Sequence, residues 1–304
     1  MRTALVLGVV LGCGRVGFEP TATATDDAPV GTADGRADAG ASVDATCTLG
    51  PLAGPTPIAE VNLPGSVEWG AWISDDGLEL LFGSDRAGGA GGSDLYQARR
   101  ASTDVIFDPP VALTALNAAG NDDNPLVSAD GLTIWFDRDL TLMTATRPSP
   151  DAAFGAPTVA GLTTVGDEYA IDLSADGLIL VATSDRLGTT DLFLATRAST
   201  AAPFGVTTQL AGLNGPGFEC CPTLSPDGQM LVYTSSSVGP STNNLAQATR
   251  SGGTFVAPGA FEPVAPTLTG RDIDAYWARS GRFLVFSSDR DGSFDLYLLT
   301  ASCP

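Results

Sequence analysis

The chain has 304 residues and a formal net charge of −20, and all fifteen of its basic residues are Arg. The complete absence of Lys and His excludes His-based acid–base catalysis, His metal ligands and Lys Schiff bases. So acidic a chain is also a poor partner for nucleic acids, because little on it could neutralise phosphates. Its 43% hydrophobic content nevertheless predicts a folded core.

The first thirteen residues, MRTALVLGVVLGC, have the pattern of an export signal. Arg2 precedes an apolar run that is too short to span a membrane as a helix. The run ends in VLGC, which resembles a bacterial lipobox. That resemblance implies that residues 1–12 are a signal peptide and that Cys13 carries a diacylglycerol. A plain signal peptide without lipidation is the alternative.

Residues 13–46 consist largely of Ala, Thr, Asp and Gly, with almost no large apolar side chain. Such a segment buries too little apolar surface to offset the conformational entropy lost on ordering. We therefore expect a lipidated N-terminus followed by a disordered acidic tether. The folded domain is expected over residues 47–304.

A unit of strand, tight turn, strand, polar loop and third strand recurs five times in this domain, and in four copies a fourth segment opens with Phe. The turns end in a glycine, which accepts the positive φ that a tight turn needs. The repeat period of about 50 residues is typical of propeller blades. The five turn glycines are Gly77, Gly131, Gly177, Gly228 and Gly281.

Four strands per unit predict an all-β fold, a five-bladed β-propeller of four-stranded antiparallel blades. The S-x-D-G, S-D-R and D-L-Y/F elements, as in Ser184-Asp185-Arg186 followed by Asp191-Leu192, resemble the WD-repeat-like blades of the TolB-type propeller family. The resemblance extends over about residues 50–304. It implies contacts with lipoproteins and membrane-spanning partners in the bacterial envelope. The fold alone does not name a function, because it serves many unrelated tasks.

The last repeat lacks a fourth segment, and residues 49–63 look like one. We expect this N-terminal segment to complete the fifth blade and close the ring, which removes open strand edges. The same alignment makes Cys47 and Cys303 neighbours at the seam. An exported protein permits a disulfide there, and two unpaired surface thiols are the alternative.

Cys220 and Cys221 are adjacent in the sequence, in a segment expected to be a loop just before the first strand of the fourth repeat. A vicinal disulfide is the first interpretation, and a reduced pair of small packing residues is the second. A metal site is the least favoured, because no His exists to complete it.

A carboxylate stands nine residues before each turn glycine. Equivalent positions in equivalent blades predict an acidic ring at the mouth of the central channel. Such a ring would attract a cation on the central axis, and Ca²⁺ suits a set of oxygen ligands. In the alternative, each carboxylate has a structural role and accepts hydrogen bonds from nearby backbone groups. The five residues are Glu68, Asp122, Glu168, Glu219 and Asp272.

These features favour a monomeric, non-enzymatic envelope protein that binds an envelope protein or a cell-wall component. It would be exported and held by its lipid at the outer membrane, on the periplasmic side or at the cell surface. A glycan-active hydrolase or lyase is an alternative, because paired carboxylates of the acidic ring could supply acid and base. A propeller that binds a cation is another. We assign no catalytic residue from the sequence.

We predict that Cys47 and Cys303 are joined in the native protein, because closure of the ring brings their segments together. Closing so long a loop is worth on the order of 4–5 kcal/mol in the chain-entropy account of disulfides. Non-reducing peptide mapping by mass spectrometry should find the two peptides linked. Alkylation of both thiols in native, unreduced protein would contradict the pairing.

Overall fold

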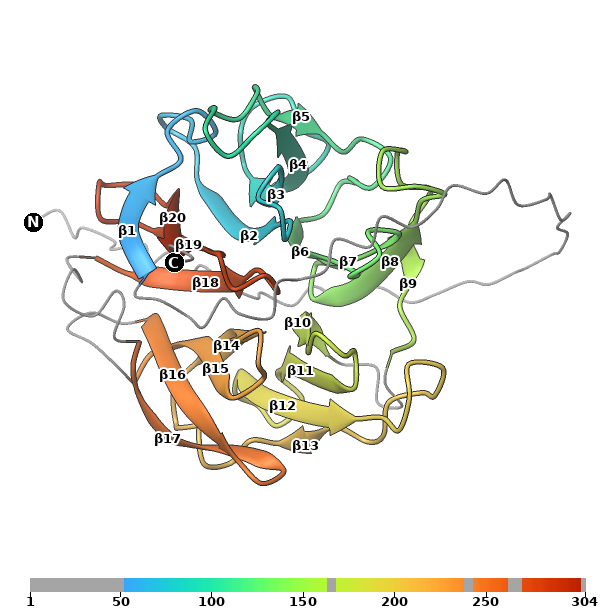
Figure 1. The fold of residues 1–304 in the computed structure, drawn as a ribbon, viewed down its shortest axis with the longest axis vertical. Helices are drawn as coiled ribbons and strands as arrows, with labels where there is room; N and C mark the ends of the chain where they lie inside the picture. Colours follow the sequence, from blue (N-terminus) through green and yellow to red (C-terminus); the bar gives the residue numbers. More distant parts are fainter. Residues whose placement is uncertain (1–51, 163–167, 238–242, 262–269, 302–304) are drawn as a thin grey trace, which may run out of the picture. The chain divides into compact units, whose positions relative to one another are not determined.

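A computed structural model describes residues 52–162, 168–237, 243–261 and 270–301 (Figure 1). Among these residues, no helix is both long enough and apolar enough to cross a membrane. The predicted signal peptide and tether lie outside the described residues. So do Cys13, Cys47 and Cys303, and the predictions made for them therefore stay predictions.

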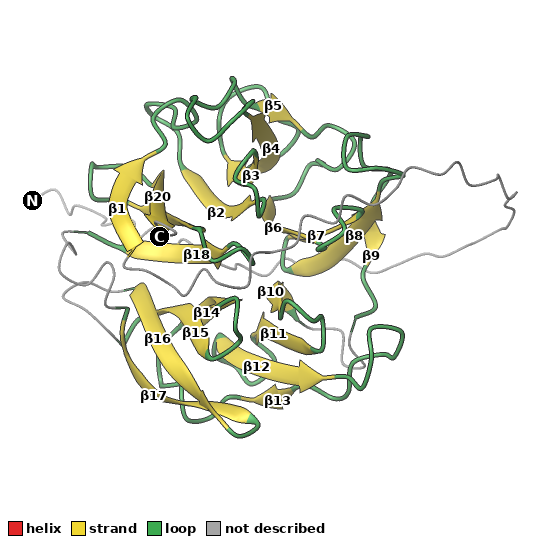
Figure 2. Ribbon diagram, in the orientation of Figure 1, coloured by secondary structure: helices red, strands yellow, loops and turns green. Residues whose placement is uncertain are grey.

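The described strands form five four-stranded antiparallel sheets (Figure 2). Blade 1 consists of β2 (Glu68–Ile73), β3 (Glu79–Ser84), β4 (Asp94–Arg99) and β5 (Val111–Ala112). Blade 2 consists of β6 (Asp122–Val127), β7 (Thr133–Arg138), β8 (Thr141–Thr146) and β9 (Thr158–Val159). Blade 3 consists of β10 (Tyr169–Leu173), β11 (Ile179–Ser184), β12 (Asp191–Thr196) and β13 (Thr208–Gln209). Blade 4 consists of β14 (Glu219–Leu224), β15 (Met230–Ser235), β16 (Asn244–Ser251) and β17 (Thr254–Ala260). Blade 5 consists of β18 (Asp272–Trp277), β19 (Phe283–Ser288), β20 (Asp295–Ala301) and β1 (Leu52–Pro57).

The blades surround a central axis, with the inner strands β2, β6, β10, β14 and β18 nearest to it (Figure 1). Within each blade the strands are neighbours in chain order, except that β1 is added at the outer edge of blade 5. The five-bladed, all-β propeller predicted from the repeats is confirmed.

Closure of the ring is also confirmed, and one side chain shows why the N-terminal segment fits. Strand β1 pairs antiparallel with β20. Just after β1, the side chain of Asn62 donates a hydrogen bond to the carbonyl of Leu296 and accepts one from its N–H, at 3.2 and 2.8 Å. Asn117 and Asn214 form the same two bonds with the third strands of their own blades. The N-terminal segment therefore replaces the missing fourth segment in detail.

The hydrophobic core lies between neighbouring sheets, because both faces of each blade are covered. Alternation along β15 shows this, since successive side chains of a strand point to opposite faces. Leu231 and Tyr233 pack in a cluster with Ile179 and other residues of blade 3. Val232, between them, packs in a cluster with Trp277 of blade 5. Each blade therefore contributes to two cores, and its strands are apolar on both faces.

The Arg that recurs after the third strand fastens the tight turn. In three blades its Nε donates a hydrogen bond to the carbonyl of the turn glycine, at 2.6–2.7 Å. The same guanidinium lies 4.4 Å from the centre of the Phe ring that opens the fourth segment. These residues are Arg100, Arg147 and Arg197 with Phe107, Phe154 and Phe204. The repeated Arg and Phe thus stabilise these three blades, each through one cation–π contact and one charged hydrogen bond.

Candidate functional site

The five carboxylates predicted to form an acidic ring lie at the entrance of each inner strand, and all are at most 3% exposed. Four of them pair with an Arg of their own blade at 2.5–3.0 Å. The pairs are Glu68 with Arg86, Asp122 with Arg138, Glu168 with Arg186 and Asp272 with Arg290. Burial raises the pKa of Glu68 and of Asp122, and the Arg partner opposes that rise.

Blade 4 shows what happens where the S-D-R element is missing. Ser237 stands where blades 1, 3 and 5 have Arg, and its hydroxyl lies 3.4 Å from a carboxylate oxygen of Glu219. Ser235 and the N–H of Gly215 also donate to this carboxylate, at 3.1 and 2.8 Å. The repeat acids are thus bound within their own blades, which supports the structural role that the sequence left open.

The residues that reach the axis stand two positions further along each inner strand. There the register against the second strand shifts by one residue in all five blades, which is a β-bulge. The bulged residue has a positive φ of 41–56° in each case. Bulges of this kind re-aim a side chain and are common beside functional sites. The five residues are Gly70, Asn124, Ala170, Cys221 and Asp274.

These bulges also join the blades to each other. Because the bulge turns the N–H of this residue away from its own sheet, it can donate to the preceding blade. Ala170 donates to the carboxylate of Asp137 at 3.0 Å, and Cys221 donates to the hydroxyl of Thr183 at 3.0 Å. Asp274 donates in the same way to Thr234 at 3.0 Å. The same kind of hydrogen bond therefore recurs at three successive seams of the ring.

The seam between blades 1 and 2 uses a different contact. The second-strand residue there is Gly83, and a Cβ at this position would lie 2.5 Å from a carboxylate oxygen of Asp123. Without that Cβ, Asp123 of blade 2 reaches into blade 1. It accepts hydrogen bonds from the indole of Trp69 at 2.5 Å and the hydroxyl of Ser93 at 2.6 Å.

Side chains and backbone of the bulge ring line a cavity to which all five blades contribute. The space open to the centres of water molecules is about 40 Å³. One such molecule needs roughly 10–15 Å³ on this measure, so the cavity has room for a few waters or a hydrated ion. It cannot enclose a sugar ring. None of the five repeat carboxylates is among the described residues that line it.

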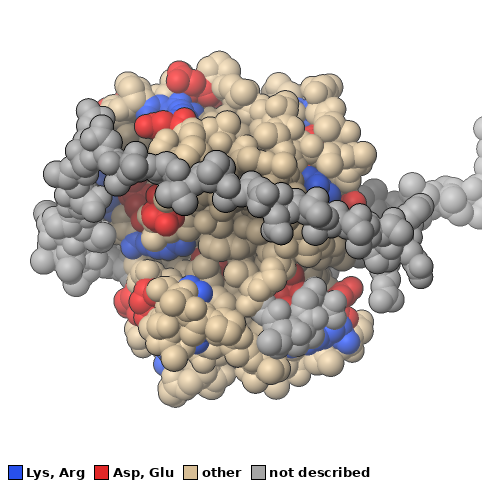
Figure 3. Space-filling model, turned by 90° about the vertical axis from the view of Figure 1, so that its right-hand side faces the viewer, with Lys and Arg blue, Asp and Glu red and all other residues tan. Residues whose placement is uncertain are grey.

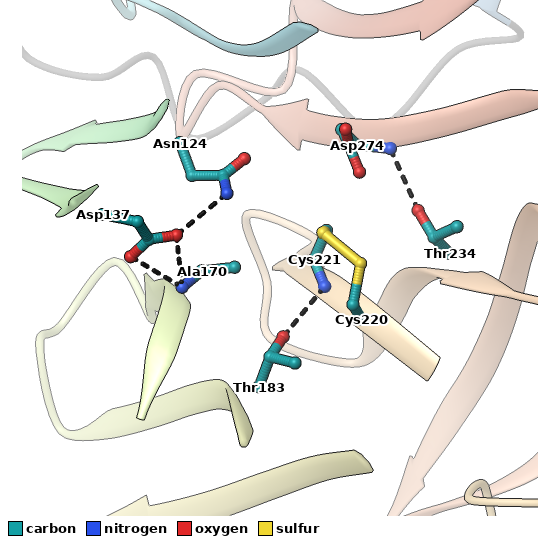
Figure 4. The surroundings of a disulfide bond; sticks show 8 residues. All are labelled: Asn124, Asp137, Ala170, Thr183, Cys220, Cys221, Thr234 and Asp274. Carbon is teal, nitrogen blue, oxygen red and sulfur yellow. Dashed lines mark hydrogen bonds between the residues drawn. A yellow bond between two sulfur atoms is a disulfide. The ribbon is translucent and has the colours of Figure 1, made fainter. Parts of the chain in front are cut away.

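A vicinal disulfide and a carboxylate meet at this cavity (Figure 4). The structure bonds the sulfur atoms of Cys220 and Cys221, and a carboxylate oxygen of Asp274 lies within 4.8 Å of both. On the opposite side, the amide of Asn124 donates to Asp137 at 2.9 Å. Polar groups from blades 2, 4 and 5 thus converge on this small cavity.

Three carboxyl groups around the cavity have raised pKa values. Burial raises the pKa of Asp274 to about 7, and the negative charge of Asp123 adds to the effect. Burial also raises the pKa of Asp137 to about 7, although Asn124 and the N–H of Ala170 oppose it. The pKa of Asp123 rises to about 6, again mainly through burial. These three carboxyl groups therefore hold protons near neutral pH, whereas separate, solvated carboxyl groups would release theirs.

Arg279 lies across the axis at the end where the inner strands finish. It follows β18 of blade 5, yet its guanidinium donates to the carbonyl of Val127 in blade 2 at 3.3 Å. These blades are not neighbours in the ring. Burial alone would lower the pKa of Arg279, but Tyr276, Asp172 and other acidic groups outweigh it and raise the value. One half-buried cation therefore balances the acidic groups at this end.

The sequence contained a signal for the bulge ring that repeat reasoning passed over. The bulged residue stands seven positions before each turn glycine, in the same register as the acidic ring. The five residue types at this position differ, whereas those at the acidic position are all carboxylates. Where the residue type varies within an otherwise strict repeat, the blade does not need one particular side chain. Such a position is therefore open to a specific function.

No family model matches the sequence, and no curated protein matches it. Solved structures do resemble the fold. An alpha-L-arabinofuranosidase from Podospora anserina, solved with cellotriose, is 12% identical, with a TM-score of 0.54 over 84% of this chain and 98% of that one. The catalytic domain of a GH62 alpha-L-arabinofuranosidase from Coprinopsis cinerea is 11% identical, with a TM-score of 0.54 over 83% and 97%. The likeness shows the fold alone.

TolB propellers are also among the similar structures. TolB from Acinetobacter baumannii is 16% identical, with a TM-score of 0.43 over 77% of this chain. The match spans 54% of that protein, and 65% of a protein described as TolB from Agrobacterium tumefaciens. Scores of this size identify no family for the chain.

We predict that Glu68→Gln destabilises the protein by about 3 kcal/mol, because it leaves the nearly buried Arg86 without its counter-charge. Glu219→Gln is the matched control. Its partners are hydroxyls and an N–H, to which an amide oxygen can still accept bonds, so its cost should stay below about 1.5 kcal/mol. Urea unfolding at pH 7 measures both. Equal costs would contradict the assigned role of the Arg pairs.

We predict that Asp274→Asn stabilises the protein at pH 8 and has little effect at pH 4. The folded-state pKa of Asp274 lies above its unfolded value, so its proton favours the folded state and that contribution is lost as pH rises through about 7. Asparagine removes this titration. Thermal melts of both proteins from pH 4 to 8 measure the difference, with exposed Asp104→Asn as control. A gain that does not grow with pH would contradict the prediction.

Proposed function

We propose that the protein is a non-enzymatic β-propeller of the bacterial cell envelope that binds an envelope protein or a cell-wall component. One observation carries most of the argument. The carboxylates that the sequence offered for glycan chemistry are buried in ion pairs and hydrogen bonds within the blades. The axial cavity is too small for a sugar ring. Neither place allows a carboxylate pair to flank a glycosidic bond.

The surface supports a binding role. On the face in Figure 3, acidic and Arg side chains lie beside one another over a mostly uncharged surface. Large apolar side chains are also exposed near the outer strands, among them Ile106, Val159 and Val206, which are 67–72% exposed. Mixed charge with dispersed apolar side chains suits a protein partner better than a polyanion.

The proposed attachment and export rest on the N-terminal sequence. The lipobox-like VLGC would provide a lipid on Cys13, and the acidic tether would let the propeller reach a partner. In this proposal the propeller is a monomer held at the outer membrane by its lipid alone.

Photo-crosslinking in living cells tests the proposal. A photoreactive amino acid placed at Ile106, Val159 or Val206 should give a discrete adduct with an envelope protein, or retention on purified cell-wall sacculi. Cys13→Ser should move the protein from the membrane fraction to the soluble envelope fraction. Placement at buried Val232 is the matched control and should give no adduct. Absence of adducts and of sacculus retention at all three exposed sites would overturn the proposal.

A glycan-active enzyme is the second candidate, because the two arabinofuranosidases above share the fold over most of their length. Purified protein should be screened on arabinose-containing and other polysaccharides beside Glu168→Gln, Glu219→Gln and Asp274→Asn. The binding proposal expects no turnover by the wild type. Turnover that one of these substitutions abolishes without unfolding the protein would establish the enzyme instead.

A further inference from the structure

We propose that Cys220, Cys221 and Asp274 form a redox-dependent site for a thiophilic divalent cation such as Zn²⁺. The site is closed to the ion while the disulfide is intact and becomes competent when the pair is reduced. The cation would lie at the axial cavity, bound by two thiolates and one carboxylate.

Geometry is the first support. Both sulfur atoms and a carboxylate oxygen of Asp274 lie within 4.8 Å of one another, and no other trio of Cys, Asp or Glu among the described residues meets this condition. A single ion 2.0–2.3 Å from each ligand atom can bridge groups at this spacing, by the usual zinc–oxygen and zinc–sulfur distances.

The ligands stand on rigid elements, as a metal site requires. The two cysteines belong to β14 and Asp274 to β18, both inner strands of the propeller. The backbone N–H of Cys221 is bound by Thr183, and that of Asp274 by Thr234. These two bonds form the seams on either side of blade 4, so the fold itself sets the distance between the ligands.

The cavity provides the remaining coordination position. Cys221 and Asp274 are both among its lining residues. Its space of about 40 Å³ admits an ion with a water molecule or two, but no large ligand. Three protein ligands and one water give four-coordinate zinc with an open position.

Charge also favours a cation. Reduction and deprotonation would place two thiolates beside the Asp274 carboxylate. Asp123 and Asp137 interact electrostatically with Asp274. The chain has no His, so Cys sulfur is the main soft donor that it offers to such an ion.

A dithiol reductant transfers two electrons and two protons to the Cys220–Cys221 disulfide, and becomes a disulfide itself. Zn²⁺ then displaces the two thiol protons and forms two Zn–S bonds and one Zn–O bond. Disulfide sulfurs carry no negative charge, so the oxidised pair offers the ion only the carboxylate. By linkage, bound metal stabilises the reduced pair against reoxidation.

Zinc titration of the full-length protein tests the site. One sample is reduced with a water-soluble phosphine, which adds no competing thiol, and the other is left oxidised. The reduced protein should bind one Zn²⁺ at this site, at least about 100-fold more tightly than the oxidised protein. Co²⁺ in place of Zn²⁺ should give thiolate-to-metal absorption in the near ultraviolet. Because the two samples share one sequence, an altered fold of a variant cannot explain the difference.

Three variants assign the ligands. Cys220→Ser combined with Cys221→Ser should abolish the reduction-dependent site, and Asp274→Asn should weaken it by roughly tenfold or more. Asp172→Asn is the matched control, since Asp172 is a buried acid of β10 that hydrogen-bonds to Thr223 instead. Equal affinity of oxidised and reduced protein overturns the proposal. So does zinc retained by the double serine variant, which would place the metal on other cysteines, or unchanged affinity of Asp274→Asn.

Discussion

The ring depends on a hydrogen bond that a propeller cannot obtain from its sheets alone. Each inner strand carries a bulge, and in blades 3, 4 and 5 the backbone N–H of the bulged residue donates to the preceding blade. Asp137, Thr183 and Thr234 accept these bonds at three seams. A buried N–H without an acceptor costs about 1–3 kcal/mol, so each of these acceptors stabilises its seam. The same bulges decide which side chains reach the axis.

Two rings of residues therefore stand two positions apart and have opposite characters. The outer one is chemically uniform, and its carboxylates are bound by Arg or hydroxyl groups of their own blades. The inner one is chemically mixed, and it brings a disulfide and Asp274 to one cavity. The outer ring is uniform because every blade needs a carboxylate at this position to bind groups of its own strands and loops. The bulged residues at the axis differ because the bonds between blades use their backbone N–H, so the repeat does not fix their side chains.

Much of the architecture was predictable because it is local and repeated. The spacing of the turn glycines gave the number of blades, and the apolar-Asn pattern of residues 49–63 gave the strand that closes the ring. Asn62 repeats the bonds of Asn117 and Asn214, so the prediction rested on a real physical equivalence. The candidate site was less predictable. The sequence pattern indicated the acidic position, which holds the buried ion pairs. The residues that line the axial cavity stand two positions further along each inner strand.

The sequence by itself determined the fold class and the blade count, because turn chemistry and strand periodicity repeat about every fifty residues. It also determined the closure, because residues 49–63 match the fourth segment that the last repeat lacks. Only the tertiary structure decided which side chains meet. Cys221 and Asp274 are 53 positions apart in a chain where every blade has an equivalent residue, and nothing local distinguishes them. A one-residue bulge turns them toward the axis, and ring closure brings the five blades around one cavity. The repeat marks the position of each bulge but not how the bulge turns its residue or which residues then meet, so the site emerges only in three dimensions.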